Sequence, residues 1–162
     1  MTKERKHIIT MLVEDQPGVL TRIAGMFARR GFNIDTITVG KTTKEGISKM
    51  VIAAIGDDAT LEQVEKQMNK LIDVVKVIEM PEDKSVMREL CLVKVAIPNK
   101  KAKEDILRYT KIYKTKIVDI TQKAITAELI GVPAKIDAFI DLMKQFGIKE
   151  ISRTGVTAVS RG

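Results

Sequence analysis

The stretch HIITMLVEDQPGVLTRIAGMF, residues 7–27, holds the two patterns that decide the fold. Residues 7–13 form a short, nearly continuous apolar run, which is typical of a buried strand. Pro17 and Gly18 then interrupt the run. Apolar residues next recur at helical spacing, at Leu20, Ile23, Ala24 and Phe27. The stretch therefore predicts a strand, a tight turn and an amphipathic helix, which Gly31 ends as a C′ residue.

Strand and helix patterns continue to residue 80. Residues 34–39 and 47–55 are rich in β-formers and flank a polar turn, which indicates a hairpin. The tetrapeptide Thr60-Leu-Glu-Gln63 fits a capping box and opens a second helix. Residues 74–80 form a β-branched strand. The first half thus runs strand, helix, strand, strand, helix, strand.

The second half repeats this plan after a polar segment, PEDKSVMR, which is interpreted as a linker over residues 81–88. Strands are expected at residues 90–97, 115–121 and 124–130, with a last strand over 148–152 and 156–159 bent at Gly155. Helices are expected over residues 102–112 and from Pro133. The predicted fold is α+β, with two ferredoxin-like βαββαβ domains at residues 1–80 and 89–162.

Composition excludes several kinds of active site. The 162 residues include a single histidine, His7, and a single cysteine, Cys91, too few for a zinc site or a Cys–His nucleophile pair. Glycine-rich phosphate-binding motifs are absent from the sequence. Cys91 lies in an apolar strand and is interpreted as core, and His7 as a packing or surface residue. A stand-alone enzyme is disfavoured.

The N-terminal sequence lacks the features of a signal peptide, and no stretch is apolar enough for a membrane span. We therefore expect a cytoplasmic protein with no membrane contact.

The formal net charge of +7 is concentrated in the second half. Residues 1–80 carry 12 basic and 11 acidic side chains, whereas residues 89–162 carry 14 and 8. A basic run follows residue 99, at Lys100, Lys101, Lys103, Arg108, Lys111, Lys114 and Lys116. Such a run is typical of a solvated helix face, but it also fits an acidic protein surface or a nucleic acid. Nucleic-acid association stays the alternative function, although no helix-turn-helix, KH or aromatic RNA-binding pattern accompanies the charge.

The turn over residues 14–20 is the candidate binding element. Gly18 lets a ligand approach the backbone closely, and the first N–H groups of a helix attract a carboxylate. Asp15 lies beside them and can hold an ammonium group. A free α-amino acid carries both groups, so the turn forms a minimal receptor for one. The same residues also fit a turn that binds nothing.

A resemblance of the first half of the chain to a known family lies in VEDQPGVLTRIAGMFARRGFNIDTITVG, residues 13–40, and continues over residues 47–77. The first half resembles the ACT domain, an amino-acid-binding βαββαβ module. ELCLVKV, GVPAKIDAF and SRTGVTAVSRG in the second half extend the resemblance to the small regulatory subunit of acetolactate synthase. The resemblance implies a non-catalytic subunit that binds and activates the large catalytic subunit and confers feedback inhibition by valine or another branched-chain amino acid. Thiamine diphosphate, magnesium and FAD would then belong to the catalytic partner, with no cofactor on this chain.

The resemblance also implies a homodimer through the ACT domains, with the effector at their interface. Effector-binding positions carried over are Asp15, Gln16, Pro17, Gly18, Val19, Leu20, Asn33 and Ile34. Asp15 stands where many family members have Asn, which leaves the effector's identity open. We expect the second strand to lie next to the first in the βαββαβ sheet, so that Asn33 at its start can face the turn across the top of the sheet. An ACT regulator of another amino-acid pathway enzyme is the further alternative.

Overall fold

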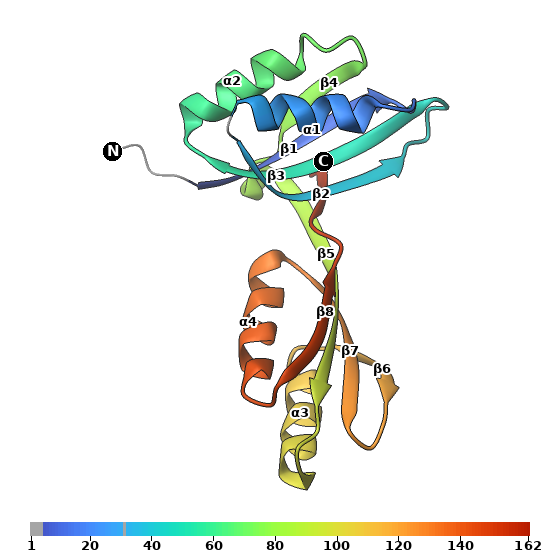
Figure 1. Ribbon diagram of the computed structural model, residues 1–162, viewed down its shortest axis with the longest axis vertical. Helices are drawn as coiled ribbons and strands as arrows, with labels where there is room; N and C mark the ends of the chain where they lie inside the picture. The colour runs from blue at the N-terminus through green and yellow to red at the C-terminus, as the bar shows by residue number, and fades with distance from the viewer. Residues whose placement is uncertain (1–4, 31) are drawn as a thin grey trace. The chain divides into compact units, whose positions relative to one another are not determined.

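The computed structural model describes residues 5–30 and 32–162, which divide into two compact units (Figure 1). Unit 1 takes in the described part of residues 1–86 together with Gly155–Gly162, and unit 2 takes in Met87–Thr154. The sequence-based division differs, because it assigns residues 155–162 to the second domain. Gly31, the predicted end of the first helix, lies outside the described residues.

Unit 1 has the predicted βαββαβ order. Its elements are β1 (Arg5–Glu14), α1 (Val19–Arg29), β2 (Asn33–Lys41), β3 (Ile47–Gly56), α2 (Asp58–Met68) and β4 (Val74–Glu79). The sheet order is β2-β3-β1-β4, and each neighbouring pair is antiparallel. The second strand therefore lies beside β3 and not beside β1, so the predicted adjacency of the first two strands is wrong. In a βαββαβ chain the hairpin partner β3 occupies the position next to β1.

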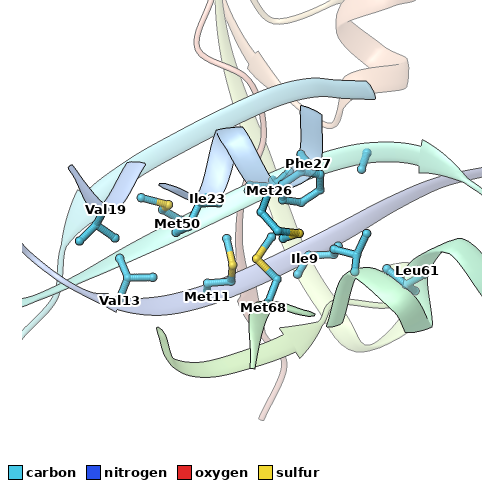
Figure 2. Close-up of a cluster of buried hydrophobic side chains, with 13 residues drawn as sticks. Ile9, Met11, Val13, Val19, Ile23, Met26, Phe27, Met50, Leu61 and Met68 are labelled. Carbon is cyan, nitrogen blue, oxygen red and sulfur yellow. The ribbon is translucent and has the colours of Figure 1, made fainter. Parts of the chain in front are cut away.

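The core of unit 1 fills the space between the sheet and the two helices (Figure 2). Alternate strand residues such as Ile9, Met11 and Ile52 point into it, because successive side chains of a strand face opposite sides. From α1 it receives Val19, Ile23, Met26 and Phe27. Leu20 lies about 100° further round the helix than Val19 and is 47% exposed, so its predicted place on the buried stripe is wrong.

The second helix of unit 1 begins earlier than predicted. Its N-cap is Asp57, whose carboxylate accepts a hydrogen bond of 2.7 Å from the backbone N–H of Thr60. Thr60 therefore lies inside the first turn of α2 and does not cap it. Asp57 and Asp58 precede the predicted capping box, and Asp57 stands three residues before Thr60, the spacing at which an N-cap side chain accepts a backbone hydrogen bond.

Unit 2 repeats the same plan and strand order. Its elements are β5 (Ser85–Ala96), whose first residues belong to unit 1, α3 (Lys100–Ile112), β6 (Lys116–Ile120), β7 (Ala124–Gly131), α4 (Pro133–Lys144) and β8 (Ile148–Arg153). The sheet order is β6-β7-β5-β8. Cys91 is fully buried in this core, as predicted, and burial raises the pKa of its thiol. The α+β prediction of two ferredoxin-like βαββαβ units is confirmed.

Two segments differ from the sequence-based interpretation. The expected linker is ordered: it holds a short 3-10 turn, η1 (Glu82–Lys84), and the first residues of β5. Ser85, the first residue of β5, is buried. The expected last strand is two strands, β8 and β9 (Thr157–Ser160), both of which pair with β5. Gly155 separates them with φ +81°, a backbone conformation that favours glycine, so the predicted bend falls where the strand breaks. Among the described residues, no helix is long and apolar enough to cross a membrane.

Candidate functional site

The turn between β1 and α1 is held in place by backbone hydrogen bonds. The N–H of Glu14 donates to the carbonyl of Asp73 at 2.9 Å, and the N–H of Asp15 donates to the carbonyl of Gly46 at 2.8 Å. Gly18 is the N-cap of α1, and no side chain caps this helix terminus. Pro17 precedes the N-cap and so presets the turn instead of the first helical turn. The first N–H groups of α1 form the positive end of the helix dipole and have no side-chain cap, and the N–H of Val19 makes only a long 3.4 Å hydrogen bond to the carbonyl of Gln16.

Gly18 is required by this geometry for two reasons. Its φ of +86° lies in the left-handed region, where a Cβ is strained. A Cβ built there would also lie 3.2 Å from Nη1 of Arg22, a tight contact. A side chain at position 18 would therefore strain the turn and press against the Arg22 guanidinium.

Arg22 is the functional candidate that the sequence analysis missed. Its Nε donates to Oδ2 of Asp73 at 2.7 Å, and Asp73 is buried. The hydrogen bond to Asp73 raises the pKa of the Arg22 guanidinium above its ordinary value. Asp73 thus positions the Arg22 guanidinium beside Gly18. In the sequence Arg22 reads as an ordinary surface residue, because its partner lies 51 positions away.

The exposure of the predicted site residues divides them into two groups. Asp15, Gln16, Pro17 and Gly18 are exposed, and their polar groups are available to a ligand. Val19 is buried in the core, so it can offer a ligand only its backbone.

Two apolar side chains stay exposed at this end of the sheet. Leu20 at the start of α1 is 47% exposed, and Val39 near the end of β2 is 50% exposed. Val39 pairs with Met50, which packs in the same core cluster as Val13 and Val19. The sequence analysis did not select Val39, because alternation alone makes it a core-facing strand residue.

Asn33 and Ile34 lie at the opposite end of the sheet from the turn. Asn33 pairs with Ile55 of β3, and Ile55 also pairs with Lys6 near the start of β1. The turn follows Glu14, which pairs with Ile47 at the other end of β3. Eight residues of strand separate the two levels, which corresponds to about 27 Å. The expectation that Asn33 faces the turn within its own chain is therefore wrong.

Asn33 is exposed, whereas Ile34 is half-buried against the core. Near this far end, a small hollow is lined by residues that include His7, Phe32 and Gly56. His7 is buried, with Nε2 3.1 Å from the carbonyl oxygen of Gly56 and Nδ1 3.3 Å from Oε1 of Glu79. The hydrogen bonds of His7 are local to the ends of the strands, and it takes no part in the turn.

The fold of unit 1, with an open turn at Gly18 between its first strand and helix, defines an ACT domain. Family models agree: the AHAS small subunit-like ACT domain matches residues 9–76, and the small subunit of acetolactate synthase matches residues 88–162. The chain belongs to the acetolactate synthase small-subunit family.

Relatives of this family cover almost the whole chain. A probable acetolactate synthase small subunit of Methanothermobacter thermautotrophicus is 54% identical over 96% of this chain and 93% of its own length. The acetolactate synthase small subunit of Aquifex aeolicus is 47% identical over 97% of this chain and 82% of its own length. The crystal structure of the small subunit from Thermotoga maritima matches with a TM-score of 0.89 and 42% identity, covering 98% of each chain.

Proposed function

We propose that this chain is the regulatory subunit of acetolactate synthase in branched-chain amino acid biosynthesis. It binds and activates the large catalytic subunit in the cytoplasm, and it lets valine or another branched-chain amino acid inhibit the complex. Thiamine diphosphate, magnesium and FAD are carried by the catalytic subunit. The observation that carries the proposal is the open turn at Gly18, where a helix terminus without a side-chain cap lies beside the Arg22 guanidinium and can receive one small anion.

The groups around the turn match the three parts of a branched-chain amino acid. The effector's carboxylate accepts hydrogen bonds from the first N–H groups of α1, and the Arg22 guanidinium, held by Asp73, lies beside them. The exposed carboxylate of Asp15 pairs with the effector's ammonium group. The exposed side chains of Leu20 and Val39 supply apolar surface for the aliphatic end.

The site is completed by a second copy of the chain. β2 is an edge strand of the unit 1 sheet, so one side of its backbone is available to another strand. If two β2 strands pair antiparallel about a twofold axis, Asn33 of one copy meets the end of β2 near Lys41 of the other. Lys41 pairs with Ser48, next to the level of Glu14 and the turn. A dimer therefore brings together the two groups of residues that a single chain holds about 27 Å apart.

Inhibition then follows from a shift in populations. A bound amino acid stabilises whichever arrangement of the dimer it fits best, and the catalytic subunit responds to the difference. Such couplings amount to about 1–3 kcal/mol in comparable systems.

Reconstitution with the catalytic subunit tests this proposal. Acetolactate formation from pyruvate is measured for the catalytic subunit alone, with this chain, and with this chain plus valine. We expect activation by the chain and inhibition by valine. No co-elution and no change in rate would contradict the proposal. Salt-sensitive binding of DNA or RNA without any response to valine would favour the nucleic-acid alternative instead.

A further inference from the structure

The C-terminal residues cover the outer face of the unit 1 sheet, which is the face turned away from the core. We call residues 155–162 the C-terminal strap (Figure 1). Oγ1 of Thr38 on β2 donates to the carbonyl of Val156 at 3.1 Å, and Nζ of Lys49 on β3 donates to the carbonyl of Ala158 at 2.7 Å. Val51, which faces outward by alternation with Met50, is nevertheless only 2% exposed. The sheet therefore has a cover on both faces.

Polar groups are incompletely satisfied beneath this cover. Among the described residues, the buried hydroxyls of Thr10, Thr36 and Ser85 have no hydrogen-bond partner. Thr10 and Thr36 lie on the outer face, and Ser85 follows Lys84, whose carbonyl accepts from the N–H of Arg161 at 2.9 Å. Water can satisfy such hydroxyls when they become exposed, so these three groups lower the cost of moving the strap.

The strap contacts three strands: β9 pairs with β5, Lys49 of β3 donates to Ala158, and the first residues of the strap lie against β2, the strand that carries the proposed effector residues Asn33 and Ile34. Gly155 lies against Thr36, and a Cβ at Gly155 would be 2.8 Å from Cβ of Thr36. The carbonyl of the next residue, Val156, accepts the hydrogen bond from the hydroxyl of Thr38. Thr36 and Thr38 lie on β2 between Asn33 and Lys41, so a movement of this edge strand changes the seat of the strap. At its other end the strap continues directly into β8 of unit 2 through Thr154.

We propose that the C-terminal strap couples the effector site to unit 2, with Gly155 and Thr38 as the positioning residues that seat it on β2. This inference rests on the proposed function. An amino acid bound at the β2 edge favours one seating of the strap, and the covalent connection to β8 passes that change on to unit 2. A binding step and a transmission step are thus separate and can be broken separately.

The test measures both steps on the full chain with its catalytic subunit, using valine as the probe. In the Gly155→Ala variant, the φ of +81° and the contact with Thr36 disfavour the seated strap. We expect the valine dissociation constant, measured by calorimetry, to stay within about threefold, while inhibition at saturating valine falls to about half or less. Gly147→Ala is the matched control, because Gly147 also has a positive φ of +92° but its Cβ would meet only Ala96 at an ordinary 3.8 Å. This control should remain fully inhibited.

A second pair of variants covers the case in which Gly155→Ala does not fold. Thr38→Val removes the hydrogen bond to Val156 at nearly constant shape and should weaken inhibition without abolishing valine binding. Thr38→Ser keeps the hydroxyl and should restore inhibition. Full inhibition in Gly155→Ala and Thr38→Val would overturn the coupling role, as would a parallel loss of binding and inhibition. A wild-type chain that gives no response to valine would instead overturn the proposed function itself.

Discussion

Units 1 and 2 share one topology but treat the start of their first helix differently. In unit 2 the side chain of Asn99 caps α3, with Oδ1 accepting from the N–H of Ala102 at 2.8 Å. In unit 1 the equivalent position is Gly18, which has no side chain and leaves the terminus of α1 uncapped. A cap satisfies the same N–H groups that would otherwise bind an anion. The comparison teaches that a binding site can arise in this fold where a structural cap is left out.

Different ion pairs stabilise the start of the first strand in the two units. Arg5 of unit 1, opposite Gly56, pairs with Asp58, and both side chains are largely exposed. Glu89 of unit 2, opposite Gly131, is buried and accepts two hydrogen bonds from Arg153, which also donates to Asp137. These contacts raise the pKa of Arg153 far above its ordinary value. Unit 2 therefore uses charge for stability at a place where unit 1 has only a surface pair.

Gly18→Asp should have the largest effect, because it places a carboxylate at the open helix terminus that distinguishes unit 1 from unit 2. The new carboxylate repels the effector's carboxylate and competes for Arg22, so we expect an active complex that valine does not inhibit at about 100 times the wild-type half-inhibitory concentration. Inhibition curves of the reconstituted complex provide the measurement. Gly18→Asn is the matched control, because Asn tolerates a positive φ and carries no charge, and it should retain partial inhibition. Wild-type inhibition in Gly18→Asp would rule out the turn as the site.

Arg153→Met should destabilise the chain by about 3 kcal/mol, because it leaves the Glu89 carboxylate buried without its charged partner. Arg5→Met removes the exposed equivalent and should cost less than about 1 kcal/mol. Urea unfolding of both variants measures the free energies. Equal losses in the two variants would show that the ion pairs do not distinguish the units.

Asn99→Ala should lower stability by about 1 kcal/mol, because α3 loses its cap. Inhibition by valine should stay at the wild-type level, since we assign no ligand to this terminus. Thermal unfolding and inhibition curves on the same preparation give both values. A change in valine response would mean that the capped terminus also takes part in regulation.

Asp15→Asn should have the smallest effect. The amide keeps an oxygen acceptor for the ammonium group but loses the charge, and an exposed pair of this kind contributes about 0.5–1 kcal/mol. We therefore expect valine to bind about two- to fivefold more weakly in calorimetry. Tighter binding would mean that the turn gains more from lower negative charge near the carboxylate than it loses at the ammonium group.

The order of strands and helices could be predicted from the sequence because each element has its own local signal. The apolar run of β1, the helical spacing of α1 and the polar turn of the β2–β3 hairpin are all contained within short stretches. The importance of Gly18 was also predictable, because a glycine between a strand and a helix indicates a backbone conformation or a close approach that a side chain would hinder. Local signals therefore defined the plan of both units and the place of the turn.

Features that depend on distant contacts could not be predicted. The separation of Asn33 from the turn follows from the sheet order, which local periodicity does not contain. Arg22 acquires its role from Asp73, and the C-terminal strap acquires its place from hydrogen bonds to Thr38 and Lys49. Each of these contacts joins residues at least 51 positions apart.

The central claim is that the open turn of unit 1 binds an amino acid together with Asn33 of a second copy, and a mixing experiment tests it most directly. Gly18→Asp and Asn33→Ala chains are each titrated with valine, then unfolded, mixed in equal amounts, refolded and titrated again. We predict little binding by either variant alone. In the mixture, the mixed dimers regain one intact site each, so about a quarter of the wild-type number of sites returns. Wild-type binding by Asn33→Ala alone, or no recovery in the mixture, would contradict a site shared between two copies.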